Sequence, residues 1–104
     1  MHAQIISYQL KNISQADYEK QMVQMDAPVL AAVNGLFSKV WLSNPGENTY
    51  GGFYLWESQE HMQNFMASDL IKAVMSRPFL TTIHSVDYAV AEGPSRITRG
   101  LLAA

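Results

Sequence analysis

The residue best suited to chemistry is a lysine within an apolar, aromatic segment. Lys39 alternates with Phe37 and Trp41 in the run FSKVWL, a pattern typical of a β-strand, so the three side chains share one face. If that face is buried, the charged form of Lys39 is disfavoured and the residue can hold an enolate or a phenolate. In a second interpretation, which stays open, Lys39 lies on an edge strand with its ammonium in water.

Aromatic residues near this lysine predict either a pocket or a packed interior. Tyr54 and Trp56 alternate on a second strand-like run, GGFYLW, and together with Trp41 they are candidates for binding a substrate. They are equally suited to a core or a subunit interface. Tyr8 and Tyr88 carry hydroxyls that either donate to a bound oxygen atom or remain within a packed core.

The histidines offer a candidate base but no metal site. His84 is the only histidine in a predicted strand, and imidazole titrates near neutral pH, so it is a candidate general base beside Lys39. A structural role for His84 is the alternative. His2 and His61 add no metal-ligand spacing, no acidic cluster accompanies them, and the chain has no cysteine. We therefore expect no bound metal.

These residues are positioned by a hairpin predicted over Phe37 to Glu57. The segment Asn44 to Thr49, rich in Asn, Pro and Gly, is typical of a turn between two strands. Apolar side chains occupy both parities of each arm, which predicts a hairpin covered on both faces. Gly51-Gly52 lacks a phosphate-loop pattern and indicates a close approach or a bulge instead.

The remaining elements follow in chain order. Residues 3–10 read as a strand, and a helix opens at Asn12 or Ser14 and ends at Asn34-Gly35. Pro28 predicts a kink or restart near Met25 to Ala27. The predicted buried stripe of this helix is Tyr18, Met22, Met25, Val29 and Val33. A second helix begins after Ser58, allows a break at Ser68-Asp69 and ends at Arg77-Pro78, with a buried stripe of Met62, Phe65, Met66, Leu70, Ala73 and Val74.

A fourth strand over residues 80–90 completes a β-α-β-β-α-β order. Right-handed connections then give a ferredoxin-like α+β fold, a four-stranded antiparallel sheet with the helices on one face. Residues 1–104 form one domain, and the other sheet face is expected to pack against a second copy in a two-fold dimer. The tail, residues 92–104, is expected to lie along that neighbour.

The composition of the chain limits the classes of partner that we expect. The chain has 104 residues, a formal charge of -2 at pH 7 and no apolar run long enough to cross a bilayer. We therefore expect neither nucleic acid nor membrane as a partner. The absence of cysteine and of a visible signal peptide leads us to expect a cytoplasmic protein.

Two short signatures lie on the two arms of the hairpin, Lys39-Val40-Trp41 and Gly51-Gly52-Phe53-Tyr54-Leu55-Trp56. With the element order, the proline in the first helix and the tail, they resemble the YdhR-type family of mono-oxygenases over nearly the whole chain. That family belongs to the dimeric α+β barrels, whose monomers are ferredoxin-like. The resemblance implies a homodimer and an oxygenase activity without bound metal or flavin.

Three hypotheses for function stay open. The first is a homodimeric oxygenase without a cofactor, acting on a small aromatic or quinol-like compound. Its catalytic candidates are Lys39 and His84, and its substrate-binding candidates are Tyr8, Trp41, Tyr54 and Trp56. The second is a small-molecule-binding or stress-related dimer of the same fold with no turnover. The third is a structural dimer whose aromatic residues only pack.

Overall fold

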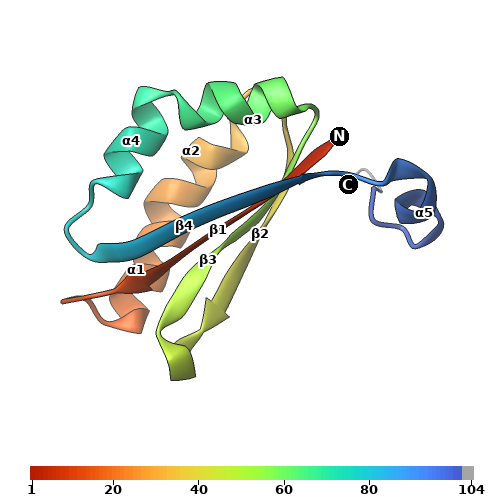
Figure 1. Ribbon diagram of the computed structural model, residues 1–104. Helices are drawn as coiled ribbons and strands as arrows, with labels where there is room; N and C mark the ends of the chain where they lie inside the picture. The colour runs from red at the N-terminus through yellow and green to blue at the C-terminus, as the bar shows by residue number, and fades with distance from the viewer. Residues whose placement is uncertain (102–104) are drawn as a thin grey trace.

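A four-stranded antiparallel sheet organises the computed structural model, which describes residues 1–101. The strands are β1 (His2–Leu10), β2 (Leu36–Asn44), β3 (Thr49–Trp56) and β4 (Leu80–Ala89), in the spatial order β2-β3-β1-β4. Helices α1 to α4 cover one face of this sheet (Figure 1). The predicted ferredoxin-like architecture is confirmed. Within the described part of the chain, no helix is long and apolar enough to cross a bilayer.

The first helical segment is interrupted by a π-helix. It consists of α1 (Gln15–Gln21), the π-helix η1 (Met22–Asp26) and α2 (Ala27–Ala31). Ser14 caps α1, because its hydroxyl accepts a hydrogen bond from the backbone N–H of Asp17 at 3.1 Å. Pro28 stands in the first turn of α2, directly after the π-helix, whose last bond runs from the N–H of Ala27 to the carbonyl of Met22. The predicted restart before Pro28 is thus present, as a wider turn.

This wider turn moves the buried face of the segment. A π-turn adds one residue to the helical period, so the side chains that follow it point in different directions from those of a continuous α-helix. Asp26 and Leu30 are buried, whereas Met25 and Val29 are 59% and 49% exposed. The predicted stripe is correct for Tyr18, Met22 and Val33 and wrong for Met25 and Val29.

The second helical segment divides at the predicted break into α3 (Gln59–Met66) and α4 (Asp69–Met75). Ser58 and Ser68 cap the two helices through their hydroxyls. The break also changes the helical phase, so that Ile71 enters the core while Ala73, predicted to be buried, is exposed. The two helices pack over β1 and β3 and enclose the core with α2.

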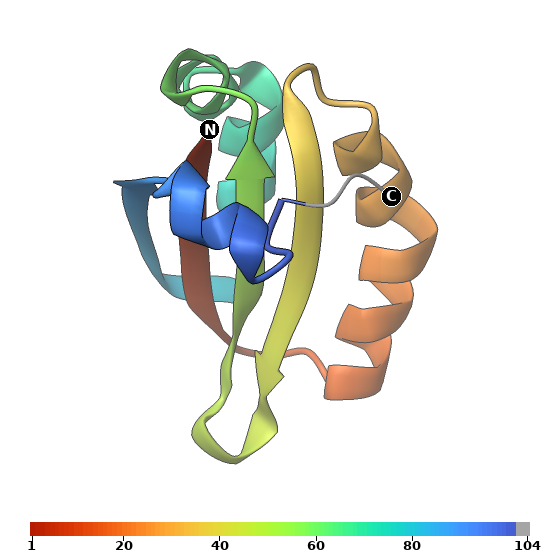
Figure 2. The same ribbon diagram turned by 90° about the vertical axis from the view of Figure 1, so that its right-hand side faces the viewer.

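The opposite sheet face is partly open. Strand pairing places Val40 and Leu42 of β2 on this face, with Val86 and Tyr88 of β4. Helix α5 (Glu92–Ile97) crosses in front of β1 and β3 and leaves the rest of the face uncovered (Figure 2). Residues up to 101 of the tail lie on the open side of the sheet, where Ser95 and Leu101 line a pocket with Ala3 and Leu55. Residues 102–104 lie outside the described part, and contact of the tail with a second subunit stays a prediction.

Candidate active site

A small chamber lies between the helix-covered face of the sheet and the segment α1–η1–α2. It encloses about 30 Å³, roughly the volume of one water molecule in the liquid. Its wall is mostly apolar. The polar side chains that line it are Tyr8, Asp26, Lys39, Tyr54 and Arg77.

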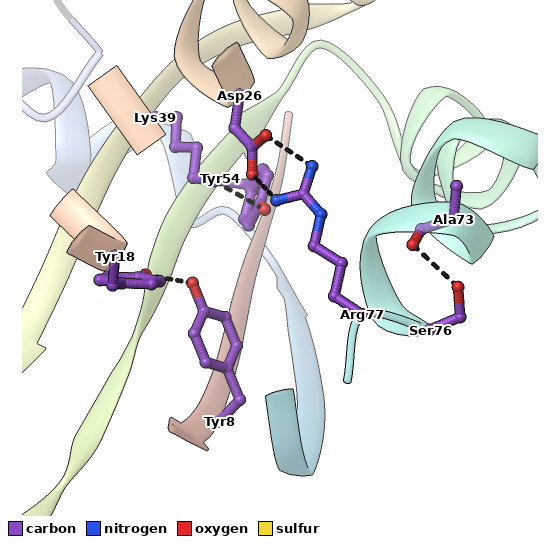
Figure 3. A network of polar contacts seen from close by, with 8 residues as sticks. All are labelled: Tyr8, Tyr18, Asp26, Lys39, Tyr54, Ala73, Ser76 and Arg77. Carbon is purple, nitrogen blue, oxygen red and sulfur yellow. Dashed lines mark hydrogen bonds and ion pairs between the residues drawn. The ribbon is translucent and has the colours of Figure 1, made fainter. Parts of the chain in front are cut away.

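Lys39 extends across β3 into this chamber. Its Nζ donates a hydrogen bond of 2.9 Å to the hydroxyl oxygen of Tyr54 (Figure 3) and lies 3.3 Å from the centroid of the Trp41 ring. Within residues 1–101, no carboxylate forms an ion pair with Lys39. Burial lowers the pKa of Lys39 to about 7, and the negative charge of Asp26 opposes this shift. The ammonium is therefore not extended into water, and the amine is readily neutral near physiological pH.

The glycine pair on β3 makes room for this lysine. Gly52 faces Trp41 across the strand pair, and a Cβ on Gly52 would lie 2.5 Å from the Cε of Lys39. Gly51 has a φ of +156°, and a Cβ there would lie 1.9 Å from the carbonyl oxygen of Ile6. The close approach predicted for the glycine pair is thus present at both positions: the Lys39 side chain lies against Gly52, and the backbone of β1 lies against Gly51.

Three tyrosine hydroxyls add hydrogen-bond donors on the same side of the sheet. The hydroxyls of Tyr8 and Tyr18 are hydrogen-bonded to each other (Figure 3). Burial is the main cause that raises the pKa of Tyr8, Tyr18 and Tyr54, and the nearby Asp26 carboxylate adds to the effect. These hydroxyls therefore stay protonated at neutral pH. One of Tyr8 and Tyr18 donates its proton to the other, which leaves two of the three hydroxyls available to donate to an anion.

A buried ion pair between Asp26 and Arg77 was not anticipated from sequence. Asp26 is 5% exposed, and the guanidinium of Arg77 donates two hydrogen bonds to its carboxylate, one of them 2.7 Å long. The pair links η1 to the connection between α4 and β4. From sequence, Arg77 was used only to end the second helix and Asp26 was given no role, because a continuous α-helix would have turned Asp26 away from the core. A π-turn placed before Pro28 would have revealed it.

The structure brings four of the predicted site residues to the chamber and leaves two elsewhere. Tyr8, Lys39, Trp41 and Tyr54 line it. Trp56 is fully buried, stacks on Tyr54 and donates its indole N–H to Gln4 at 3.0 Å, so it supports the chamber wall from within the core.

His84 lies on the opposite side of the sheet. It pairs with Ser7 of β1, whereas Lys39 pairs through Tyr54 with Gln4, and residues 4 and 7 of one strand point to opposite faces. His84 is exposed on the open face, and Tyr88 lies on the same face. The expectation that His84 borders one pocket with Lys39 is thus corrected, because within one chain the sheet separates them.

Two open grooves flank the chamber at the β2 edge. One, of about 330 Å³, runs between α1–η1 and the outer half of β2 past Tyr18 and Leu42. The other, of about 300 Å³, runs between α2 and the inner half of β2 past Leu30 and Lys39. Trp41 borders both grooves and the chamber. Each groove is of a size that binds small ligands, so a ligand would approach Lys39 beside Trp41.

Comparison with known proteins places the chain in one family. Residues 4–101 match the family model described as "Putative mono-oxygenase ydhR". A search of curated protein sequences gave no significant match.

Solved structures share the fold at low sequence identity. SnoaB, a cofactor-independent oxygenase from Streptomyces nogalater, is 15% identical, with a TM-score of 0.67 over 88% of this chain and 93% of its own. The monooxygenase from the ActVA-Orf6 gene of Streptomyces coelicolor, bound to nanaomycin D, is 16% identical, with a TM-score of 0.66 over 88% of each chain. The haem-degrader MhuD from Mycobacterium tuberculosis, with two haems bound, is 20% identical, with a TM-score of 0.69 over 88% of this chain and 96% of its own.

The chamber does not fit a haem. Its lining includes no histidine: His2 is paired with Asp87, His61 contacts Ser58, and His84 lies on the other sheet face. The raised pKa values of the lining tyrosines oppose the deprotonation that ligation of iron requires. Within residues 1–101, no three His, Cys, Asp or Glu side chains are grouped to hold a metal ion.

Proposed function

The chain belongs to the ydhR mono-oxygenase family, and we propose that it is a mono-oxygenase that oxidises a small aromatic or quinol-like compound without a metal, flavin or haem. The observation that carries this proposal is the buried amine of Lys39, held between Trp41 and the Tyr54 hydroxyl. A neutral amine in a mostly apolar chamber is a base, and oxidation of such compounds by oxygen begins with the loss of a proton.

Lys39 first removes a proton from the substrate. With its pKa at about 7, close to half of the amine is neutral at neutral pH. The proton passes from a phenolic hydroxyl, or from an acidic C–H, to Nζ and leaves an anion on the ring. The ammonium then lies against that anion in a site of low polarity, where the attraction is stronger than in water.

The anion then reacts with molecular oxygen without an outside reductant. One electron passes from the anion to oxygen, the two radicals combine, and a new carbon–oxygen bond forms as a peroxide. Cleavage of the O–O bond leaves one oxygen atom on the ring, and the other departs as water with two protons from the substrate. For a hydroquinone the products are a hydroxyquinone and water, so the substrate supplies all the electrons.

The tyrosines hold the charge that grows on oxygen. The chamber has room for little more than one oxygen atom, so the substrate ring lies in a groove and only its oxygen enters the chamber, where the protonated hydroxyls of Tyr8 and Tyr54 donate hydrogen bonds to the oxyanion. The Asp26–Arg77 pair lies at the same chamber but satisfies its own charges. It fixes η1 over the chamber, while Trp41 forms the wall toward the grooves.

A second copy of the chain is proposed to cover the open sheet face. This face exposes large apolar side chains on both outer strands, more than a monomer usually leaves in water. They are Val40, Leu42, Val86 and Tyr88, which are 43% to 62% exposed. A reducing compartment such as the cytoplasm suits this chain, which has no cysteine.

Light scattering at micromolar concentration tests the dimer. Val86→Asp places a charge on the open face and is expected to shift the protein to monomer. Val23→Asp places the same charge on an exposed position of the helix layer and is expected to leave the dimer intact. A wild-type monomer, or equal effects of the two substitutions, would refute the model.

Oxygen consumption with a panel of hydroquinones and anthrones tests the activity. Lys39→Met is expected to lower the rate about 100-fold or more, in line with loss of a general base. Lys39→Arg separates base from charge, because arginine keeps the cation but does not deprotonate, and it is expected to be as inactive as Lys39→Met. Lys72→Met, at an exposed lysine of α4, is the matched control.

Two further outcomes are decisive. Loss of the activity on treatment with a chelator would contradict the proposal that no metal takes part. Ligands that quench tryptophan fluorescence and bind tightly, with no oxygen consumed by any of them, would favour the binding protein without turnover.

A further inference from the structure

Lys39 lines the inner groove as well as the chamber. The groove between α2 and the inner half of β2 has walls of Ala27, Leu30, Leu36, Phe37 and Trp41, and the side chain of Lys39 also lines it. The same Nζ reaches the Tyr54 hydroxyl in the chamber. The Lys39 side chain thus borders both spaces, with its amine against Tyr54.

Among residues 1–101, the charged groups that face Lys39 leave its amine without an ionic partner. Asp26 is the acidic residue lining the chamber, and its carboxylate is held by two hydrogen bonds from Arg77. The effect of burial on Lys39 exceeds the opposing effect of Asp26. The other three lysines of the chain, Lys11, Lys20 and Lys72, are exposed.

We infer that Lys39 is also a nucleophile, and that it forms a reversible imine with small, uncharged aromatic aldehydes and ketones that enter along the inner groove. This inference goes beyond the oxygenase proposal and does not depend on any reaction with oxygen. A desolvated lysine in an apolar pocket is an established type of carbonyl-binding nucleophile.

The atoms of the reaction balance without an oxidant or a reductant. The lone pair of Nζ attacks the carbonyl carbon and forms the C–N bond, and the carbonyl electron pair moves to oxygen. Tyr54, whose hydroxyl lies 2.9 Å from Nζ, gives a proton to that oxygen and regains one from nitrogen. Loss of water then leaves a C=N bond, so one carbonyl compound and one amine yield one imine and one water.

The groove determines the class of carbonyl compound. Its side chains are apolar apart from Ser38 and Lys39, and the rings of Phe37 and Trp41 offer stacking surfaces that favour an aromatic ligand. A carboxylate on the ligand would find no free cation at the chamber, since Arg77 is paired with Asp26 and Lys39 is consumed in the imine. An uncharged aryl aldehyde satisfies both conditions.

Reductive trapping with benzaldehyde and sodium cyanoborohydride at pH 7 tests the inference. After digestion, mass spectrometry follows addition of a benzyl group to each lysine peptide. Roughly half of Lys39 is neutral at pH 7, against a few ten-thousandths of an ordinary exposed lysine. Since a less basic amine is also a weaker nucleophile, Lys39 is expected to react at least about tenfold faster than Lys11, Lys20 or Lys72.

Two controls tie the selectivity to the site. In urea, where the fold is lost, we expect Lys39 to be trapped no faster than the other lysines. Tyr54→Phe is expected to slow trapping at Lys39 severalfold and to leave the exposed lysines unchanged. The α-amino group of Met1 is also a primary amine, but its product lies in a different peptide from that of Lys39.

Equal trapping of Lys39 and Lys72 in the folded protein would overturn the inference, as would a preference that persists in urea. The result is separable from the oxygenase test. Trapping at Lys39 with no oxygen consumed from any substrate would support the imine site and refute the oxygenase, and the reverse result would refute the imine site alone.

Discussion

The pH dependence of oxygen consumption is the sharpest test of the role given to Lys39. Burial lowers the pKa of this amine to about 7, and only the neutral amine accepts a proton. With that pKa, about a tenth of the amine is neutral at pH 6 and about nine tenths at pH 8. We therefore expect kcat/KM to rise about tenfold from pH 6 to pH 8 and then to level off.

The substrate needs its own baseline in this experiment, because a quinol ionises and oxidises faster as pH rises. Lys39→Met supplies that baseline, and the profile is taken after its rate is subtracted. An oxygen electrode across pH 5.5 to 9 is sufficient. A flat profile, or a rise centred near pH 10 as for an exposed lysine, would refute the assignment of Lys39 as the base.

Replacement of Asp26 provides a second check, because the direction in which it shifts the pKa of Lys39 is known. Its negative charge raises the pKa of Lys39 against the effect of burial. Asp26→Asn removes that charge and leaves the guanidinium of Arg77 unneutralised, and both changes lower the pKa of Lys39. The rise in kcat/KM is thus expected at lower pH in this variant. A shift to higher pH would show that the amine does not respond to the charges around it.

Three further results are expected. The pKa of Lys39 is lower in the folded than in the unfolded chain, so the free energy of unfolding increases as pH rises from 7 toward 10. In urea unfolding, this free energy should increase by about 2–4 kcal/mol more for the wild type than for Lys39→Met over that range. Gly52→Ala places a methyl 2.5 Å from the Cε of Lys39 and should lower kcat/KM about tenfold by displacing the amine. Gly46→Ala should not, because its added Cβ meets only Asn44 Oδ1, at an ordinary contact distance of 3.8 Å. Arg77→Ala leaves Asp26 buried and unpaired and should cost about 3–5 kcal/mol in urea unfolding, whereas Asp26→Leu combined with Arg77→Met should cost far less.

The sheet and its hairpin could be predicted because their signals are local. Alternating aromatic and β-branched residues define β2 and β3, and the Asn-Pro-Gly segment between them is the 3₁₀ turn Pro45–Glu47 followed by Asn48. The serine caps at Ser14, Ser58 and Ser68 are equally local, since each needs only one hydroxyl and the N–H three residues later.

The chamber was only half predictable, because two of its polar members depend on a change of helical period. A π-helix leaves no simple sequence signal, and the single additional residue per turn is enough to exchange Met25 for Asp26 at the buried face. Once Asp26 is buried, it requires a cation, and Arg77 is close by only because α4 ends beside η1. Asp26 and Arg77 are 51 positions apart in the chain, so their pairing depends on the tertiary structure and cannot be predicted from sequence spacing.

The register of the β2–β3 hairpin decides whether this chain has a site at all. Lys39 lies opposite Tyr54, and Trp41 lies opposite Gly52. A slip of one residue would send both to the open face and turn Val40 inward, since side chains alternate along a strand. Asn48 opposes such a slip at the hairpin tip, because its side chain is hydrogen-bonded to the backbone N–H and C=O of Leu10, at 3.3 Å and 2.9 Å.

The other end of the hairpin is held by a backbone hydrogen bond and by core packing of Leu36 and Trp56. The N–H of Glu57 donates to the carbonyl of Gly35 at 2.9 Å, just beyond the last paired residues, Leu36 and Trp56. Gly35 adopts a positive φ of 84° where the chain turns from the helical segment into β2. The amine of Lys39 thus owes its place against Tyr54 to contacts at both ends of the hairpin, neither of which touches the chamber.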